Sequence, residues 1–360
     1  MSLPPSEIPL GAMRFNSDSR KLEYWMGSEW MQIHTFSPNI GGISGQSGSI
    51  DGTGTRALFT GGYISPGACF NNVDAITIET QGNTIDFNNL TANKCGGYGC
   101  ADKTRAVYAG GRVSTTPGGS VTNDITSCTI SIQNDFVNQS DLTASKAFGT
   151  GFSSATRAVF AGLAVPSFDN TIDFTNIQSL GDAVDFGDTA QKNSYAFSTQ
   201  SPTRGFVIGG LRVNAPDSAS YDTIELFTTA TTGNGVDFGN LTTQRYEGAG
   251  GGNATRGIVA AGYGPNYTTI IDFFTLASSG NATTFGNLSS GNNGNGKYSA
   301  SSPTRFVVGG GYGPSPSFIN TIEYINIATQ GDSVDFGDFI NFERRSLGDP
   351  HISNGHGGLG

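Results

Sequence analysis

A Thr-Arg pair recurs six times along the chain, and each pair opens a short apolar run that ends in Gly or Gly-Gly. The arginines are Arg56, Arg105, Arg157, Arg204, Arg256 and Arg305. Their intervals are 49, 52, 47, 52 and 49 residues, and such a near-constant period indicates one structural unit copied six times. The repeat therefore restricts the fold to an array of six similar units.

Each unit carries further landmarks in a fixed order. A variable loop follows the Thr-Arg segment, and a second segment reads Thr-Ile-acid-aromatic, as in residues 321–324. A polar turn leads to a third segment ending in an aromatic that stands 29 to 34 residues beyond its Arg. These aromatics are Phe87, Phe136, Phe186, Phe238, Phe285 and Phe336. A Gly/Ser/Ala-rich stretch before the next Arg is long enough for one further strand.

Four short strands per unit, rich in β-branched and aromatic residues, are typical of a β-propeller blade. No apolar stripe of period 3.6 is present, so we expect very little helix. The Gly-rich strand suits the crowded centre of a propeller, and the repeated Phe is large enough to fill the wedge toward its rim. The sequence predicts an all-β fold with a six-bladed β-propeller of four-stranded blades over residues 55–360.

The repeats resemble those of kelch-type propellers. The matching elements are the Gly-Gly doublet closing the second strand, the acid-aromatic pair of the third strand (Glu323-Tyr324), and a fourth-strand aromatic where kelch repeats usually carry Trp. This chain differs in having Phe at that last position in all six units. The resemblance covers roughly residues 40–356 and implies a kelch-like six-bladed propeller.

Two segments can supply the innermost strand of the first blade, residues 41–49 and residues 344–352. A ring gains most when its C-terminal segment completes the first blade, because this removes two exposed sheet edges. We therefore expect residues 344–353 to close the ring and residues 35–54 to form a linker.

Residues 1–34 lie outside the repeat. Residues 1–11 read as a flexible, Pro-rich segment. Residues 12–17, 21–25 and 29–33 read as three strands separated by polar turns. A meander of this size cannot bury much core by itself, so its aromatic side chains need a partner surface.

The segment 12–34 is similar to a module near the N-termini of bacteriophage tail fibres and other virion proteins. That module reads Gly-x-Met/Ile-Arg-Phe/Tyr-Asn-x-Asp, then Lys-Leu/Phe-Glu and a Trp, and residues 11–18, 21–23 and Trp30 match it here. The resemblance implies an attachment module that contacts other virion proteins. Its candidate contact residues are Arg14, Phe15, Tyr24, Trp25 and Trp30.

Charge and hydropathy exclude several classes of function. The formal charge is −10, and the sequence has no basic stripe of the kind that nucleic-acid binders carry. It also has no apolar run of membrane-spanning length and no signal-peptide pattern. We expect a chain made in a cytoplasm, without membrane insertion, nucleic-acid partner or cofactor.

Four groups of residues have both a functional and a structural interpretation. The pair Cys95 and Cys100 could be a disulfide or half a metal site, but free buried thiols are favoured for all four cysteines, with Cys69 and Cys128. The aspartates of 182–188 and 332–338 could bind Ca²⁺, yet Asn replaces them in other units, which favours turn capping. The six repeated arginines could read an anion, but pairing with an acid of their own or the adjacent blade is favoured. His351 and His356 could be a ligand pair, and local packing is favoured.

The loops between the second and third strands differ most from unit to unit. In a four-stranded blade these six loops emerge on one face, together with the connections between blades. Aromatic and Arg side chains on a rigid ring suit a recognition surface, and tolerated surface variation is the alternative. The candidate residues are Tyr63, Phe70, Arg112, Phe168, Arg212, Tyr263, Tyr267, Tyr312 and Phe318.

These patterns predict a non-enzymatic virion protein, because the repeats offer no unique catalytic set. In this hypothesis a tail- or fibre-associated propeller is held by residues 12–34 and binds a host-surface glycan or protein through its loops. The alternative is a structural virion component, such as a capsid decoration or tail-junction adaptor, whose loops contact other virion subunits. A glycan-active enzyme is a third hypothesis, and association with further copies of the chain is compatible with all three.

Overall fold

The computed structural model describes residues 8–16, 21–33, 55–64, 68–114, 119–163, 168–214, 217–289, 294–313, 318–340, 346 and 351–359. The chain divides into two compact units, Met1–Gln46 and Ser47–Gly360. The predicted linker, most of the flexible N-terminal segment and His34 lie outside the described residues.

The first unit contains a three-stranded antiparallel meander of order β1-β2-β3. Its strands are β1 (Met13–Asn16), β2 (Lys21–Trp25) and β3 (Trp30–Ile33). The three strands predicted from residues 12–33 are confirmed to within one residue at each end. The register aligns Met13 with Tyr24 and Tyr24 with Met31, so these three side chains share one face of the meander.

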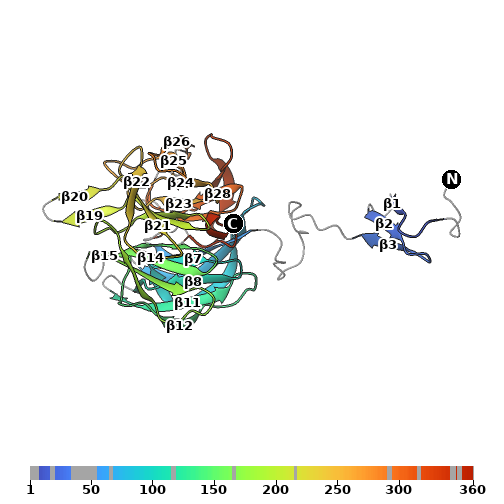
Figure 1. The fold of residues 1–360 in the computed structure, drawn as a ribbon, viewed down its shortest axis with the longest axis horizontal. Coiled ribbons are helices and arrows are strands. Elements are labelled where there is room, and N and C mark those ends of the chain that lie inside the picture. The colour runs from blue at the N-terminus through green and yellow to red at the C-terminus, as the bar shows by residue number, and fades with distance from the viewer. Residues whose placement is uncertain are drawn as a thin grey trace. The chain divides into compact units, whose positions relative to one another are not determined.

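The second unit is all-β, and its antiparallel sheets follow the sequence repeat (Figure 1). Five sheets begin with a short edge strand, which contacts the edge strands of neighbouring sheets and is called the innermost strand below. These are β7 (Tyr98–Ala101), β13 (Thr150–Ser153), β17 (Phe197–Gln200), β23 (Ala249–Gly252) and β27 (Tyr298–Ser301). The second strands begin at the repeated arginines. They are β4 (Arg56–Ile64), β8 (Arg105–Ala109), β14 (Arg157–Leu163), β18 (Arg204–Ile208), β24 (Arg256–Ala260) and β28 (Arg305–Gly309).

The third and fourth strands complete each sheet. The third strands are β5 (Ala68–Thr77), β11 (Asp124–Thr129), β15 (Asp169–Asn176), β21 (Thr223–Thr228), β25 (Ile270–Thr275) and β29 (Thr321–Asn326). The fourth strands are β6 (Ile85–Cys95), β12 (Val137–Asp141), β16 (Val184–Asp188), β22 (Val236–Asn240), β26 (Thr283–Asn287) and β30 (Val334–Asp338). All six repeated phenylalanines are buried. Within the described ranges the only helix is the short 3-10 helix η3 (Gly357–Leu359), which confirms the expected low helix content.

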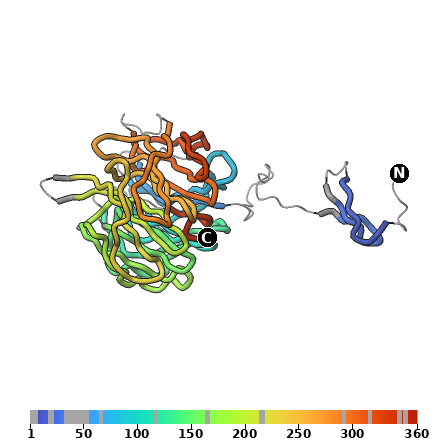
Figure 2. Tube along the Cα trace, turned by 45° about the horizontal axis from the view of Figure 1, so that its top comes forward, coloured from blue at the N-terminus to red at the C-terminus, as the bar shows by residue number. Residues whose placement is uncertain are grey.

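Two sheets depart from the simple pattern. The first has the order β10-β9-β6-β5-β4, because β9 (Arg112–Val113) and β10 (Ser120–Val121) add to the end of β6. In the fourth, β19 (Leu211–Asn214) and β20 (Asp217–Ser220) form a separate hairpin. This hairpin projects from the sheets in both views of the chain (Figures 1 and 2).

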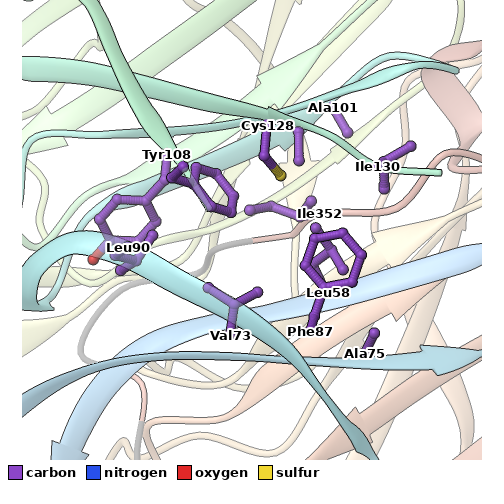
Figure 3. Close-up of a cluster of buried hydrophobic side chains, with 12 residues drawn as sticks. Leu58, Val73, Ala75, Phe87, Leu90, Ala101, Tyr108, Cys128, Ile130 and Ile352 are labelled. Carbon is purple, nitrogen blue, oxygen red and sulfur yellow. The ribbon is translucent and has the colours of Figure 1, made fainter. Parts of the chain in front are cut away.

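The first sheet obtains its missing neighbour from the C-terminal segment. Leu58 N donates to Ile352 O at 3.0 Å, Asn354 N donates to Arg56 O at 3.1 Å, and Ala57 forms an antiparallel bridge with Ser353. Ile352 lies in the apolar cluster between the first two sheets (Figure 3). The C-terminal segment is thus the observed partner of β4. The competing segment 41–49 lies outside the described residues.

Hydrophobic clusters join the sheets in chain order. Tyr98 packs with Phe160 across the second and third sheets, and further clusters join the third to the fourth, the fourth to the fifth, and the fifth to the sixth. The sixth sheet packs against the first, where Tyr298 and Phe59 meet edge to face at 6.0 Å. Every sheet therefore buries its faces against two neighbours.

The repeated arginines link neighbouring sheets through main-chain carbonyls. Arg305 Nη1 donates to Ile78 O at 3.0 Å and Glu79 O at 2.9 Å, in the turn after β5. The other five make the equivalent bonds to Ile130, Ile177, Thr229, Leu276 and Ile327. The predicted carboxylate partner is wrong for Arg105, Arg157, Arg204, Arg256 and Arg305. Turn carbonyls need a donor from outside their own sheet, and a guanidinium has several N–H groups to offer.

The aspartates and asparagines of the polar turns make the reciprocal link. Asp182 Oδ1 accepts from Asp141 N at 3.1 Å, in the last strand of the preceding sheet. Asn83, Asp135, Asn234, Asn281 and Asp332 accept in the same way. Only an acceptor oxygen is required, which explains why Asn and Asp interchange. No group of three or more His, Cys, Asp or Glu within the described residues is placed to hold a metal ion.

A surface pocket of about 210 Å³ marks a missing side chain in the first sheet. It is lined in part by Arg56, Ala75 and Ile85. In the third sheet, the residue in the register of Ala75 is Phe174, whose ring lies 4.5 Å from the Arg157 guanidinium carbon. The fifth and sixth sheets have the same arrangement. The pocket therefore occupies a place that an aromatic ring fills elsewhere.

Replacing Ala75 with Phe is expected to fill this pocket and raise the free energy of unfolding by about 1–2 kcal/mol, since a buried ring gains transfer energy and a cation–π contact with Arg56. Urea denaturation measures the change. Phe174→Ala is the matched control and should destabilise by a similar amount. A destabilised Ala75→Phe protein would show that the pocket cannot accept a ring.

Candidate recognition face

A chain of main-chain hydrogen bonds crosses from sheet to sheet just before each innermost strand. Its members are Gly96, Phe148, Tyr195, Glu247, Gly296 and Ser346, and we call it the inter-sheet ladder. From Phe148 onward, the N–H of each member donates to the carbonyl of the preceding member at 2.5 to 2.9 Å. The ladder fixes the relative positions of the connections between sheets.

The ladder requires left-handed backbone. The φ angles of Gly96, Phe148, Tyr195, Glu247 and Gly296 lie between 52° and 69°. Glycine adopts this conformation freely, whereas a residue with a side chain loses about 1 kcal/mol there. Phe148, Tyr195 and Glu247 adopt this conformation even though each carries a side chain. Strain of this kind collects at ligand-contact sites, so it points to a role for these side chains.

Five aromatic rings run side by side from the ladder onto the loop of the fifth sheet. The Phe148 and Tyr195 rings stack at 5.3 Å, Tyr195 lies 6.3 Å from Tyr246, Tyr246 lies 5.6 Å from Tyr263, and Tyr263 lies 4.9 Å from Tyr267. We call these five residues the aromatic strip. Phe148 is buried, and the four tyrosines are half-buried. The strip is therefore anchored at one end and accessible along the rest.

The structure brings several predicted loop residues together. Tyr263 and Tyr267 belong to the aromatic strip. Tyr63 lies 6.3 Å from Phe318, which packs edge to face against Tyr312 at 5.4 Å. These three form a second aromatic group between the loops of the first and sixth sheets.

The remaining predicted loop residues have different environments. The Arg112 guanidinium carbon lies 5.7 Å from the centre of the Phe148 ring, and Phe168 packs against the cluster that contains Phe148. Arg212 is exposed on the β19–β20 hairpin. Phe70 is buried at 6% exposure, so it is not a surface contact. The predicted loop 63–72 is in fact a hairpin of the long strands β4 and β5, which places Phe70 inside a sheet.

Phe148, Tyr195, Tyr246 and Glu247 were not predicted as site residues. They lie in the connections between sheets, which the sequence shows only as Gly/Ser/Ala-rich stretches. A sequence signal does exist, because aromatic residues recur two or three positions before the innermost strand. That signal has meaning only once the connections are seen to meet.

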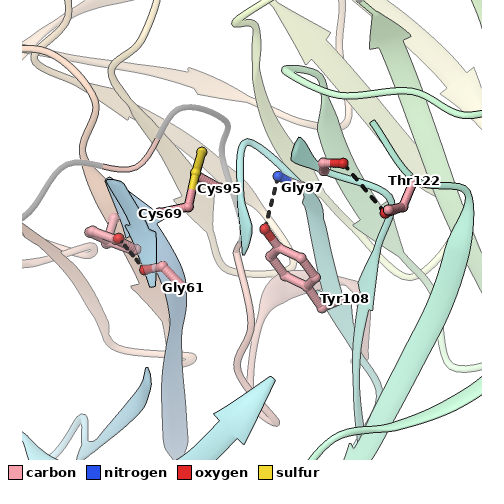
Figure 4. The surroundings of a disulfide bond; sticks show 8 residues. Gly61, Cys69, Cys95, Gly97, Tyr108 and Thr122 are labelled. Atoms are coloured by element: carbon pink, nitrogen blue, oxygen red, sulfur yellow. Dashed lines mark hydrogen bonds between the residues drawn. A yellow bond between two sulfur atoms is a disulfide. The ribbon is translucent and has the colours of Figure 1, made fainter. Parts of the chain in front are cut away.

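A disulfide joins Cys69 to Cys95 (Figure 4). The register pairs Phe70 with Lys94, which brings Cys69 to a Cα–Cα distance of 5.4 Å from Cys95. Both sulfurs lie in the cluster that contains Phe148. The favoured interpretation of four free thiols is thus wrong for Cys69 and Cys95, because their proximity depends on the nonlocal pairing of β5 with β6. Cys100 and Cys128 are free and buried, and burial raises the pKa of each thiol.

Buried cations beneath the connections are neutralised by carboxylates. The ion pairs are Lys94 with Asp124 at 2.5 Å, Lys146 with Asp173 at 2.9 Å, and Arg245 with Asp272 at 2.6 Å. Burial lowers the pKa of Lys94 and Arg245, while the carboxylate of each pair opposes that shift. These three cations are therefore paired in the interior, whereas Arg112 is half-buried over the Phe148 ring.

The C-terminal histidines also lie in the interior. Their rings are 5.9 Å apart. His351 Nε2 is 2.9 Å from Ser301 Oγ, and His356 Nε2 is 2.6 Å from Ala101 O. Burial, together with the neighbouring His356, lowers the pKa of His351 to about 3, and burial lowers the pKa of His356 to about 4. Both imidazoles are neutral at pH 7, and these contacts agree with the favoured packing role.

The N-terminal meander has two different faces. On one, Arg14 bridges to Glu23 at 2.9 Å and lies over the Trp30 ring at 4.2 Å, while Trp25 and Trp30 are 5.4 Å apart. Trp25 is buried within the meander, and Phe15, on the opposite face, is 65% exposed. Of the predicted attachment residues, Tyr24 is half-buried on the face of Phe15.

No protein-family model matches the chain, and no curated protein does so either. The described residues include no helix long and apolar enough to cross a membrane.

Proposed function

We propose that this chain is a non-enzymatic bacteriophage virion protein, assembled in the host cytoplasm, whose residues 55–360 form a closed kelch-like six-bladed propeller. Closure is supported by the contacts between the last sheet and the first. Arg305 donates to Ile78 O, Asp338 N donates to the side chain of Asn83, and Ile352 accepts from β4. These contacts repeat the ones that join sheets adjacent in sequence.

The propeller recognises a host-surface glycan or protein through the face that carries the aromatic strip. The observation that carries this proposal is the continuous run of half-buried tyrosines on a hydrogen-bonded ladder. Rigid aromatic side chains supply contact area at low entropic cost, which is why they dominate binding hot spots. Burial raises the pKa of Tyr98 and lowers that of His351, and both of these groups lie in the interior.

The N-terminal meander attaches the propeller to other virion proteins. The exposed side chains of Met13 and Phe15, 67% and 65% exposed, supply an apolar contact surface of the kind that marks interaction sites. They also favour the second candidate function, a structural adaptor whose loops contact other virion subunits.

Deletion of residues 1–34 is expected to abolish incorporation into virions while leaving a folded propeller, measured by mass spectrometry of purified particles and by circular dichroism. The Tyr263→Ala, Tyr312→Ala double variant should assemble normally and adsorb to host cells at least about tenfold more weakly, because truncated aromatic hot spots cost 2 kcal/mol or more. Normal adsorption by this double variant together with defective assembly would favour the adaptor. Retained incorporation of the truncated chain would contradict the attachment role.

A further inference from the structure

We propose that the aromatic strip is the ligand site of this face and that it binds an uncharged polysaccharide. This inference rests on the proposed recognition function and specifies its ligand. It places the contact on Tyr195, Tyr246, Tyr263 and Tyr267, with Phe148 as the anchor.

The first argument is the retained strain at Tyr195. Its φ is 54°, and glycine occupies the equivalent ladder positions Gly96 and Gly296. Glycine can therefore adopt this backbone conformation and make the same hydrogen bonds, so the Tyr195 side chain is not needed to build the ladder. Tyr195 instead extends the strip, since its ring links Phe148 to Tyr246. A large side chain held at a glycine position is a mark of a contact residue.

The second argument is the chemistry of the rings. A sugar ring presents polarised C–H groups on its flat face, and the electron-rich face of an aromatic ring attracts them. Its hydroxyl groups both donate and accept, so they match tyrosine hydroxyls. Within the described residues, the Tyr263 and Tyr312 hydroxyls make no hydrogen bond with the protein. Several rings in a row suit successive sugar units of a chain.

The third argument is charge. Stacked aromatics also bind nucleic-acid bases, but such sites need a positive groove for the phosphates. Here Lys94, Lys146 and Arg245 are at most 2% exposed and are paired with Asp124, Asp173 and Asp272, and the chain carries a formal charge of −10. Arg112 lies over the Phe148 ring and is half-buried, but the phosphates of a nucleic acid need a run of cations, and the excess of acidic residues disfavours a polyanion relative to an uncharged polysaccharide. Of the two ligand classes that stack on aromatic rings, the charge pattern therefore favours an uncharged polysaccharide over a nucleic acid.

The test uses the full chain on an array of uncharged and acidic bacterial surface polysaccharides. Wild type is expected to bind an uncharged polysaccharide. Tyr195→Gly and Tyr246→Ala should each weaken that binding at least about tenfold. Tyr195→Phe should keep it, since the ring remains. Tyr195→Gly also relieves the backbone strain, so its thermal unfolding midpoint should stay close to that of wild type. Weaker binding by this variant would then not be due to global unfolding. Val236→Ala, at a 61% exposed position of β22, is the control and should bind as wild type.

Periodate treatment of host cells separates this inference from the proposed function. Loss of cell binding after glycan oxidation, with the array result above, supports the polysaccharide. Persistent binding that still requires Tyr263 and Tyr312 overturns the polysaccharide and leaves a protein receptor. Equal array binding by wild type and Tyr195→Gly, or binding of acidic polysaccharides alone, also overturns it. An absence of any cell binding overturns the proposed recognition function as well.

Discussion

Replacing Arg245 with Met is expected to lower the free energy of unfolding by about 3–5 kcal/mol, because it leaves a buried carboxylate without its cation. Arg245 and Asp272 are both 0% exposed, and Arg245 Nη2 lies 2.6 Å from Asp272 Oδ2. The carboxylate would keep its hydrogen bonds from Thr242 but lose the ion pair with Arg245. Urea denaturation at pH 7 measures the change.

A matched variant tests the role of burial. Lys94→Met removes the equivalent cation from Asp124, whose side chain is 20% exposed, so water can replace part of the lost interaction and the cost should be smaller. The double variant Arg245→Met, Asp272→Leu should recover part of the loss, since it removes the buried charge as well. Equal costs for Arg245→Met and Lys94→Met would contradict the assignment to desolvation.

The sequence was sufficient for the strands of each repeat, because those depend on local patterns. The period of the arginines and the phenylalanines defines the sheets, and the Gly/Ser/Ala-rich stretch before each next Arg gives the place of the innermost strands. Interchange of Asp and Asn was enough to predict the capping role of Asp182, which the hydrogen bond from Asp141 N confirms. Each of these inferences uses a signal carried within one unit.

Contacts between different units could not be predicted from such local patterns. The arginines were expected to pair with acids, since charge complementarity is visible in a sequence, whereas a free turn carbonyl is not. The Cys69–Cys95 disulfide depends on the register of β5 with β6. The aromatic strip combines residues from three connections between sheets with two from a loop of the fifth sheet, so Tyr195 and Tyr246 appear unrelated until the ladder aligns them.

Acidification from pH 8 to pH 5 is expected to destabilise the protein by about 4 kcal/mol through His351 and His356 alone. The pKa values of about 3 and about 4 in the folded protein lie below the ordinary value of 6.5. At pH 5 both histidines are therefore protonated in the unfolded chain and neutral in the folded protein. Stability from these groups is complete above pH 6.5 and is lost as the pH falls toward 4. At pH 5 each histidine accounts for a loss of about 2 kcal/mol in the free energy of unfolding relative to pH 8.

Ordinary carboxylates stay ionised between pH 8 and pH 5. Burial lowers the pKa of Lys297 to about 7, so Lys297 also titrates in this window, and the contribution of the histidines is the difference between wild type and a variant that lacks them. Asp102 is the charged group acting on His356, and it opposes the shift by favouring the imidazolium. The variant His351→Gln, His356→Gln keeps polar side chains at both positions and should lose most of the pH dependence. Urea unfolding at pH 5, 6, 7 and 8 compares it with wild type, and NMR titration of the imidazoles measures the pKa values directly. If both proteins lose stability in parallel, the acid sensitivity lies elsewhere. A flattened profile in the variant would assign the acid sensitivity to the two histidines on either side of residues 352–354, which pair with β4, so that protonation and release of the C-terminal segment become one event.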